Sequence, residues 1–269
     1  MKPNKLITIF LILTLFFAFS CQKSDVKELS NEKAKYDKIG VMHNQGLEYA
    51  FKSLKAAKEN GKLAKFNDED YINLLFESTY YNAENNNCEL SKSEIEQIKS
   101  SLVVTKNRLI KLTNTKADEF IYQTILGEAE SLLTTRQKEI SQEILRVMTE
   151  SSNIETVLNN LNRIEAEINS TCDDNEKVGL LSMLSVAKHS SEYWNSNLTL
   201  WTEEFGLSKN GAKFSWGLVG CADAAYALLT GIECSPALCV PFIGWGAYLG
   251  IVGGGTVIVS GWACIAQII

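Results

Sequence analysis

Proline is scarce in this chain. There are three prolines among 269 residues, and the 170 residues that follow residue 38 contain none. Proline inside a helix removes a backbone hydrogen bond and clashes with the preceding turn, so its absence permits long helices. Strand-like alternation is also almost absent there, whereas apolar residues recur every three or four positions. The sequence therefore argues against a β-rich fold and predicts an all-α protein, a helical bundle followed by an apolar glycine-rich helical hairpin.

The motifs of common enzymes are missing as well. The chain has no G-x-S-x-G elbow, H-E-x-x-H pair, P-loop or glycine-rich dinucleotide turn. Its two histidines are His43, in YDKIGVMHNQG near Asp37, and His189, in SVAKHSSEYW. An imidazole beside a carboxylate suits general-base catalysis, but a structural histidine on a helix is far commoner. We expect no enzyme, no catalytic residue and no cofactor. An open cleft in which His43 lies within hydrogen-bond reach of Asp37 would instead favour an enzyme.

Charge limits the class of partner. The formal net charge of −6 argues against nucleic acid, which needs a basic face. The acidic runs 68–70 and 173–175 suit helix starts better than cation sites. No CxxC or Cys/His cluster supports a metal site. Aromatic side chains at helical spacing can line a binding groove but more often fill a core; here they are Tyr80, Tyr81, Tyr193, Trp194 and Trp201.

The N-terminus has the design of an export signal. A short basic segment, MKPNK, precedes an apolar run from Leu6 to Phe19. The junction AFSC resembles a relaxed bacterial lipobox, which implies a signal peptide at residues 1–20 and lipid on Cys21. Two or three acyl chains anchor firmly, since each buried methylene contributes about 0.8 kcal/mol. Residues 21–38 are then a polar tether. Gln22 favours the outer over the inner membrane. The alternative is a plain secretory signal with Cys21 as an ordinary thiol.

The remaining cysteines are even in number, which favours disulfides in an exported chain. Six cysteines permit fifteen connectivities. Cys234 and Cys239 are close enough to staple one turn. A second pair can form between two polar, loop-like stretches, NNNCEL and STCDDN. The candidates are Cys88, Cys172, Cys221, Cys234, Cys239 and Cys264.

The chain changes character near residue 211. All 26 Lys and Arg residues occur at or before Lys213, after which only Asp223 and Glu233 are charged. We expect a helical bundle at residues 39–210, built from amphipathic helices whose apolar stripes face one another. Residues 211–269 are expected to form an apolar, disulfide-stapled helical hairpin.

Each arm of that hairpin, 214–232 and 242–266, is close to the roughly 30 Å of a bilayer core. Gly246, Gly250 and Gly254 fall four apart and line one helix face, which lets the other arm approach closely. Asp223 and the triple glycine at 253–255 oppose a spanning helix. The arms can therefore enter a membrane, form a buried core or bind another chain.

Several stretches resemble uncharacterised exported lipoproteins of Bacteroidota-type bacteria. These are YDKIGVMHNQGLEYA, LLSMLSVAKHSSEYWNSN and GCADAAYALLTG. The resemblance implies a helical body with a glycine-rich, bacteriocin-like tail, and it brings no activity or site residue. We expect a non-enzymatic envelope lipoprotein that meets membrane lipid through Cys21 and through residues 214–266. The alternative is a structural or binding lipoprotein whose hairpin is core.

Overall fold

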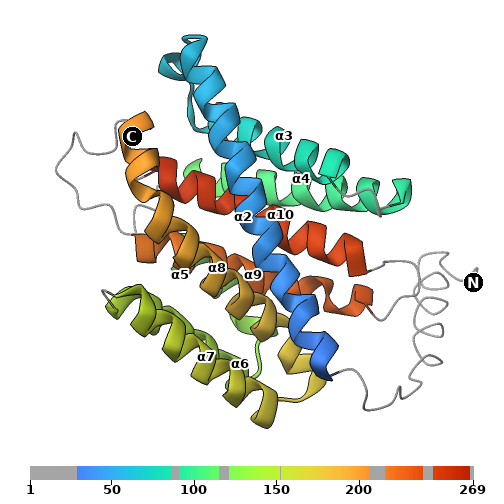
Figure 1. The fold of residues 1–269 in the computed structure, drawn as a ribbon. Helices are drawn as coiled ribbons and strands as arrows, with labels where there is room; N and C mark the ends of the chain where they lie inside the picture. The colour runs from blue at the N-terminus through green and yellow to red at the C-terminus, as the bar shows by residue number, and fades with distance from the viewer. Residues whose placement is uncertain are drawn as a thin grey trace, which may run out of the picture. The chain divides into compact units, whose positions relative to one another are not determined.

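Helices account for the described architecture of the protein (Figure 1). The computed structural model describes residues 29–86, 91–114, 121–151, 153–205, 216–238 and 245–266. Over these ranges there are nine α-helices and two short 3₁₀ helices, with no strand, which confirms the all-α prediction. The α-helices are α2 (Leu29–Glu59), α3 (Asp68–Asn86), α4 (Lys92–Asn114), α5 (Ile121–Ala129), α6 (Thr135–Glu150), α7 (Ile154–Thr171), α8 (Asp174–Phe205), α9 (Trp216–Leu238) and α10 (Trp245–Ala266). The 3₁₀ helices are η1 (Leu63–Lys65) and η2 (Glu130–Leu132).

The chain divides into two compact units, Met1–Lys33 and Ala34–Ile269. Within the first unit, the structure describes only the opening residues of α2. The signal peptide, Cys21 and most of the polar tether lie outside the described residues. All contacts below belong to the second unit. The expected change of character near residue 211 falls in the stretch 206–215, which also lies outside the described residues.

Helix starts follow the local chemistry of the sequence. Ser91 and Glu94 form a capping box: the Ser91 amide donates to the Glu94 carboxylate at 2.9 Å, and the Glu94 amide donates to Ser91 Oγ at 3.3 Å. Asp173 accepts from the amides of Asn175 and Glu176, both at 2.9 Å, at the start of α8. Asp70 exchanges hydrogen bonds with Asn67 at the start of α3. The acidic runs are therefore helix starts.

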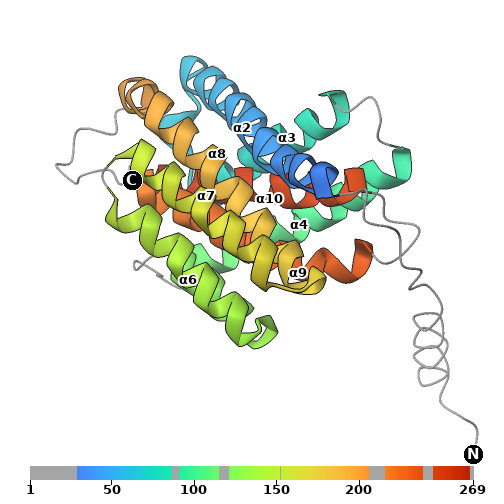
Figure 2. The same cartoon turned by 60° about the horizontal axis from the view of Figure 1, so that its bottom comes forward.

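Two helices occupy the interior of the second unit. α9 and α10 pack against each other; α8, α5 and α6 lie against α9, and α3 and α4 lie against α10 (Figures 1 and 2). α7 packs on the outside, against α6 and α8. α2 crosses both α8 and α10, because Gly40 faces His189 and Gly46 faces Val257. We call α9 with α10 the apolar hairpin, and the other helices of this unit the shell.

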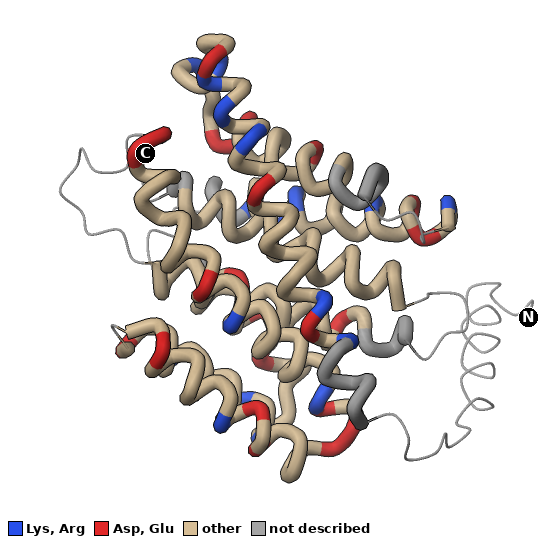
Figure 3. Tube along the Cα trace, viewed as in Figure 1, with Lys and Arg blue, Asp and Glu red and all other residues tan. Residues whose placement is uncertain are grey.

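Burial of the apolar hairpin is nearly complete. Two segments are long and apolar enough to cross a membrane by length and composition: Trp216–Cys234 is 78% buried and Trp245–Cys264 is 94% buried. Core helices of soluble proteins have the same composition, because a helix that is apolar on every face must be covered on every face. Lys, Arg, Asp and Glu instead lie mainly along the shell (Figure 3). The shell thus supplies the cover.

Two of the predicted glycines of α10, Gly250 and Gly254, admit the shell rather than the other arm. A Cβ on Gly250 would meet Ile98 of α4, and one on Gly254 would meet Thr79 of α3 and Leu102 of α4. The predicted glycine stripe therefore does lie at a close helix contact, but its partners differ from the expected one. Gly255, which the stripe did not include, faces Tyr226 of α9. The described residues do not test the prediction for Gly246.

Candidate functional site

A buried carboxylate lies at the centre of the apolar hairpin. Asp223 of α9 has no exposed surface. Its Oδ2 accepts hydrogen bonds from Ser190 Oγ of α8 at 2.6 Å and from Ser260 Oγ of α10 at 2.9 Å. His43 of α2 brings Nε2 to 3.2 Å from the same oxygen. Residues from four helices thus converge on one atom, and we call this group the Asp223 cluster: His43, Ser190, Asp223 and Ser260.

A second layer of contacts fixes the members of the cluster. Trp194 of α8 donates from Nε1 to Ser260 Oγ at 3.2 Å. On the other side, His43 Nδ1 lies 3.0 Å from Oδ1 of Asn44, whose Nδ2 donates to the carbonyl of His189 at 3.0 Å. The cluster therefore joins α2, α8, α9 and α10 through directional contacts in the interior.

Glycine at the α2–α10 contact makes the approach possible. A Cβ on Gly253 would lie 3.2 Å from the backbone carbonyl oxygen of Ile39 and 3.2 Å from Cβ of Met42. Backbone cannot move aside as a flexible side-chain end can, so only the absence of a side chain lets α2 lie this close to α10. That approach brings His43 into the interior.

The cluster contains Ser, His and Asp, yet it is not arranged for nucleophilic catalysis. A catalytic serine donates its proton to an imidazole that an acid orients. Here both hydroxyls donate to the carboxylate, and His43 Nε2 has no aligned hydrogen bond within the described chain despite its 3.2 Å contact. All four side chains have no exposed surface. This geometry orders charge in a core and gives a substrate no path to it.

Two polar atoms of the cluster have no hydrogen-bond partner in the described structure: the second carboxylate oxygen of Asp223, Oδ1, and Nε2 of His43. An unpartnered buried acceptor costs free energy, of the order of 1–3 kcal/mol and more for a charged group. The cluster is therefore a place where the core gives up stability for polar contacts.

The histidines pair differently from the sequence-based expectation. Asp37, the expected neighbour of His43, instead places Oδ1 2.9 Å from Nε2 of His189, and this pair lies at the surface. His43 is buried and faces Asp223, which lies far along the sequence. No open cleft joins His43 to Asp37 in the described chain, so the arrangement that would have favoured an enzyme is not present. Asp223 was noticed in the sequence only as a cost to membrane insertion.

The predicted disulfides are not formed by the cysteines that the structure describes. Cys172, Cys221, Cys234 and Cys264 are free thiols, and this corrects both the staple expected at Cys234 and the pairing expected of Cys172. The physical reason is packing in the hydrophobic core: Cys172 is buried there and Cys234 packs against it. Cys221 donates weakly to the carbonyl of Leu145. The other two candidates, Cys88 and Cys239, lie outside the described residues.

Three of the five aromatic candidates belong to the core. Trp194 and Trp201 have no exposed surface, and Trp201 Nε1 donates to the hydroxyl of Tyr193 at 3.1 Å. Burial raises the pKa of Tyr193 above its ordinary value. Tyr81 is 57% exposed, and Lys99 lies over the ring of Tyr80. These positions do not combine into one groove.

Further polar contacts tie the apolar hairpin to the shell. Tyr226 of α9 shares a hydrogen bond with Thr105 of α4 at 2.5 Å, and Tyr248 of α10 shares one with Ser182 of α8 at 2.7 Å. Near the end of α9, Arg108 of α4 lies 3.0 Å from Glu233. Burial lowers the pKa of Arg108, but the hydrogen bond and charge of Glu233 outweigh this and the net shift is upward.

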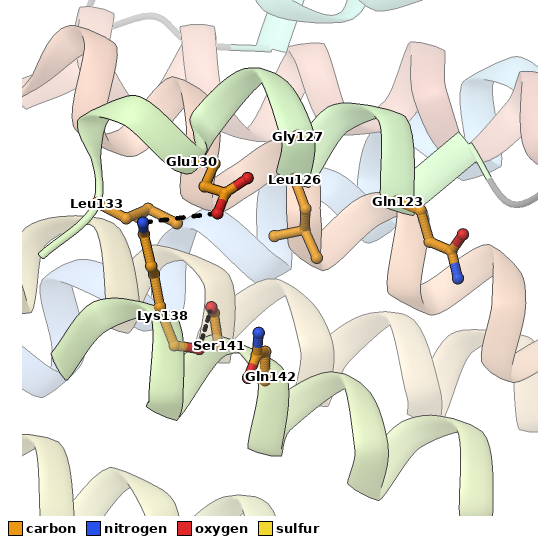
Figure 4. Close-up of a pocket in the computed structure, with 8 residues that line it drawn as sticks. All are labelled: Gln123, Leu126, Gly127, Glu130, Leu133, Lys138, Ser141 and Gln142. Carbon is orange, nitrogen blue, oxygen red and sulfur yellow. Dashed lines mark hydrogen bonds and ion pairs between the residues drawn. The ribbon is translucent and has the colours of Figure 1, made fainter. Parts of the chain in front are cut away.

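A shallow pocket of about 250 Å³ lies apart from the cluster, between α5, η2 and α6 (Figure 4). Its charged groups, Lys138 and Glu130, lie 3.7 Å apart and so partly neutralise each other, and Ser141 already donates to the carbonyl of Lys138. No group of three or more potential metal ligands occurs in the part of the chain that the structure describes. The Asp223 cluster instead has hydrogen bonds that join separate helices at one atom.

Comparison of the chain with family models, with curated proteins and with solved structures finds no match in any of the three. The features that bear on function are therefore the apolar hairpin, its shell and the Asp223 cluster.

Proposed function

We propose that this protein is a non-enzymatic, lipid-anchored envelope protein whose shell stores the apolar hairpin and releases it to a membrane. The observation that carries the proposal is the pairing of two membrane-length apolar helices with a cover of amphipathic ones. The bacteriocin-like character of the tail fits an effector of this kind. Lipid on Cys21, in the outer rather than the inner membrane, would keep the stored hairpin near a bilayer.

The dimensions of the hairpin support this proposal. The two apolar segments have 19 and 20 residues, which corresponds to about 28–30 Å of helix and matches a bilayer core. α10 contains no charged residue, and α9 contains Asp223 and Glu233. Glu233 lies near one end of its helix, where a charge can reach the interface, so Asp223 is the main cost of insertion. That cost is about 2.5–3.5 kcal/mol at a bilayer centre and falls if the carboxylate is protonated.

The shell has contacts of its own that do not involve the hairpin. Lys55 of α2 lies 2.9 Å from Glu204 of α8, and Lys188 of α8 lies 2.9 Å from Glu165 of α7. Arg136 of α6 pairs with Glu167 of α7 at 2.6 Å. Each such partly exposed pair contributes little, since surface ion pairs have a typical value of about 0–1 kcal/mol. Together these ion pairs favour continued association of the shell helices when the hairpin leaves.

A second candidate function is a structural or binding lipoprotein of the envelope in which the hairpin is permanent core. The hydrogen bonds that cross from α9 and α10 to the shell favour it, since Tyr226, Tyr248 and Asp223 each have a partner on a shell helix. Such directional bonds specify one arrangement of a core and have to be broken before the hairpin can leave.

The test is a reversible lock between α2 and α10. A Cβ on Gly46 would lie 3.3 Å from Cβ of Val257, close to the roughly 3.5–4.5 Å range of disulfides. The double variant Gly46→Cys/Val257→Cys is therefore expected to close when oxidised. Leakage of dye-loaded anionic vesicles is then measured with the oxidised and the reduced protein, and mass spectrometry identifies the bridge.

We expect leakage from the reduced protein and from wild type, and at least a tenfold lower rate from the oxidised double variant. The single variants Gly46→Cys and Val257→Cys are the controls for the substitutions themselves. Equal leakage from the locked and the reduced forms would contradict release of the hairpin. Wild type that stays folded and causes no leakage would support the permanent core instead.

A further inference from the structure

The Asp223 cluster fixes where the hydrogens of His43 lie. Asn44 donates from Nδ2 to the carbonyl of His189, which has no hydrogen to give in return. The Oδ1 of Asn44 must then face Nδ1 of His43, at 3.0 Å. An amide oxygen only accepts hydrogen bonds, so Nδ1 carries a hydrogen.

The opposite nitrogen of the ring faces an oxygen that is already an acceptor. Oδ2 of Asp223 takes hydrogens from both Ser190 and Ser260, and Ser260 is free to donate because its own oxygen accepts from Trp194. A lone pair on Nε2 of His43 would be repelled by this oxygen at 3.2 Å. A hydrogen on Nε2 turns that repulsion into the attraction of an imidazolium for a carboxylate.

We propose that His43 and Asp223 form a buried proton-binding site, in which the proton on His43 Nε2 holds α2 against the apolar hairpin. The inference goes beyond the proposed function, because it concerns the closed protein and holds whether or not the hairpin enters a bilayer. The ligand is a single proton, and the closed protein contains the imidazolium–carboxylate pair.

The surroundings offer few other charges to compensate the pair. Two thiols are close enough to feel the charge of Asp223: Cys264 on α10 and Cys221 on α9 itself. Burial and this charge raise the pKa of both. α8 contributes the hydroxyl of Ser190, and α2 contributes His43. Another ion pair, that of Asp37 and His189, lies at the surface between α2 and α8. Removal of one proton would therefore leave the Asp223 carboxylate without a counter-charge inside the core.

The direction of the pH effect follows from counting protons. When α2 leaves the hairpin, both groups meet water, where an ordinary imidazole is neutral above about pH 6.5 and an ordinary carboxylate is charged above about pH 4. Above pH 6.5 the closed state holds one proton more than the open state, so closure weakens as the pH rises. Below pH 4 the open state gains a second proton, so closure weakens as the pH falls. Closure is strongest between these limits.

The first experiment is NMR of the imidazole nitrogens in the purified protein. The chain has two histidines, so two sets of signals are expected, and His189→Gln assigns them. We expect both nitrogens of His43 to carry hydrogens at pH 7.5. A neutral His43 ring at that pH would overturn the proposal, and this measurement requires no variant of the cluster to fold.

The second experiment measures stability against denaturant from pH 6 to pH 7.5, below the range in which an ordinary thiol titrates. The equilibrium constant for opening should rise by up to about tenfold per pH unit in wild type. The rise should disappear in His43→Gln/Asp223→Asn, which keeps size and hydrogen bonding while removing both charges. It should largely remain in His189→Gln, which removes the matched surface pair. A rise that survives the double variant, or that is lost in His189→Gln, would overturn the proposal.

The outcomes separate this inference from the proposed function. Loss of the pH dependence in the double variant, with no vesicle leakage from any form, would support the proton site and contradict membrane release. Leakage that depends on the Gly46–Val257 lock but not on pH would support release and contradict the proton site.

Discussion

His43 of α2 and Asp223 of α9 lie 3.2 Å apart, and neither side chain has any exposed surface. A buried ion pair of this kind is weak evidence for stability, because removing two charges from water costs about as much as their attraction returns. It is better evidence for specificity, since it allows α2 one position on the apolar hairpin.

Removal of one hydroxyl donor from the cluster should destabilise the protein. Ser260→Ala takes a hydrogen bond from Asp223 and leaves Trp194 Nε1 without its acceptor. We expect a loss of about 2–4 kcal/mol in the free energy of unfolding, measured with urea. The matched control is Ser100→Ala, because the exposed Ser100 hydroxyl donates only to the carbonyl of Glu96 on its own helix. Its effect should stay within about 0.5 kcal/mol. Equal effects of the two substitutions would contradict a stabilising cluster.

Two helical glycines should respond to alanine with opposite sign. Gly253→Ala pushes a methyl group to 3.2 Å from the Ile39 carbonyl, so the contact of α2 with α10 must open. We expect a loss of about 1–3 kcal/mol. At Gly127 of α5 there is nothing within 4 Å of the added carbon. Gly127→Ala should stabilise the protein by up to about 1 kcal/mol through helix propensity. Thermal unfolding compares the two, and stabilisation by Gly253→Ala would contradict the packing.

The capping box of α4 should give a pH-dependent contribution. Hydrogen bonds from the backbone and the hydroxyl of Ser91 hold the pKa of Glu94 below its ordinary value. A lowered pKa in the folded state means that the contribution is present above the unfolded-state pKa and is lost as the pH falls through the folded-state pKa. Glu94→Gln should therefore lower the free energy of unfolding by about 0.3–1 kcal/mol at pH 7 and leave it unchanged at pH 2. Unfolding curves at both pH values check this, and an equal cost at both would contradict it.

Buried thiols should be protected in the native protein. Cys221 and Cys264 have no exposed surface, so alkylation requires the core to open. We expect less than about a tenth of each to react with iodoacetamide under conditions that modify both completely in denaturant. Mass spectrometry of the peptides reads each site. Rapid alkylation of Cys264 in the folded protein would show that α10 is not held as described. Oxidised Cys221 or Cys264 would restore the disulfide prediction.

The sequence was sufficient to predict the helices and the residues at which they begin. The spacing of apolar residues, the absence of proline and the Ser91–Glu94 box are local signals, and local signals survive in the fold. The apolar character of residues 216–266 was equally plain. The sequence does not show what covers these residues, because the same apolar composition suits a membrane and a shell of helices.

Long-range pairing was the part that could not be predicted. Nearness in sequence suggested Asp37 for His43, whereas the fold gives Asp223 to His43 and gives Asp37 to His189. The disulfide prediction for the described cysteines was wrong for a related reason. An even number of cysteines permits pairing but does not indicate which thiols lie close together. One signal could have found the cluster. A lone aspartate in the middle of an apolar helix needs partners, and His43, Ser190 and Ser260 were among the polar residues on other apolar faces.

The order of the helices along the chain has a consequence for how the protein is made. α9 and α10 occupy the interior, yet seven helices of the shell precede them. During synthesis, those seven emerge with inward apolar faces that nothing yet fills. The shell can bury these faces only after the hairpin has been made, so the unfinished chain is prone to aggregate.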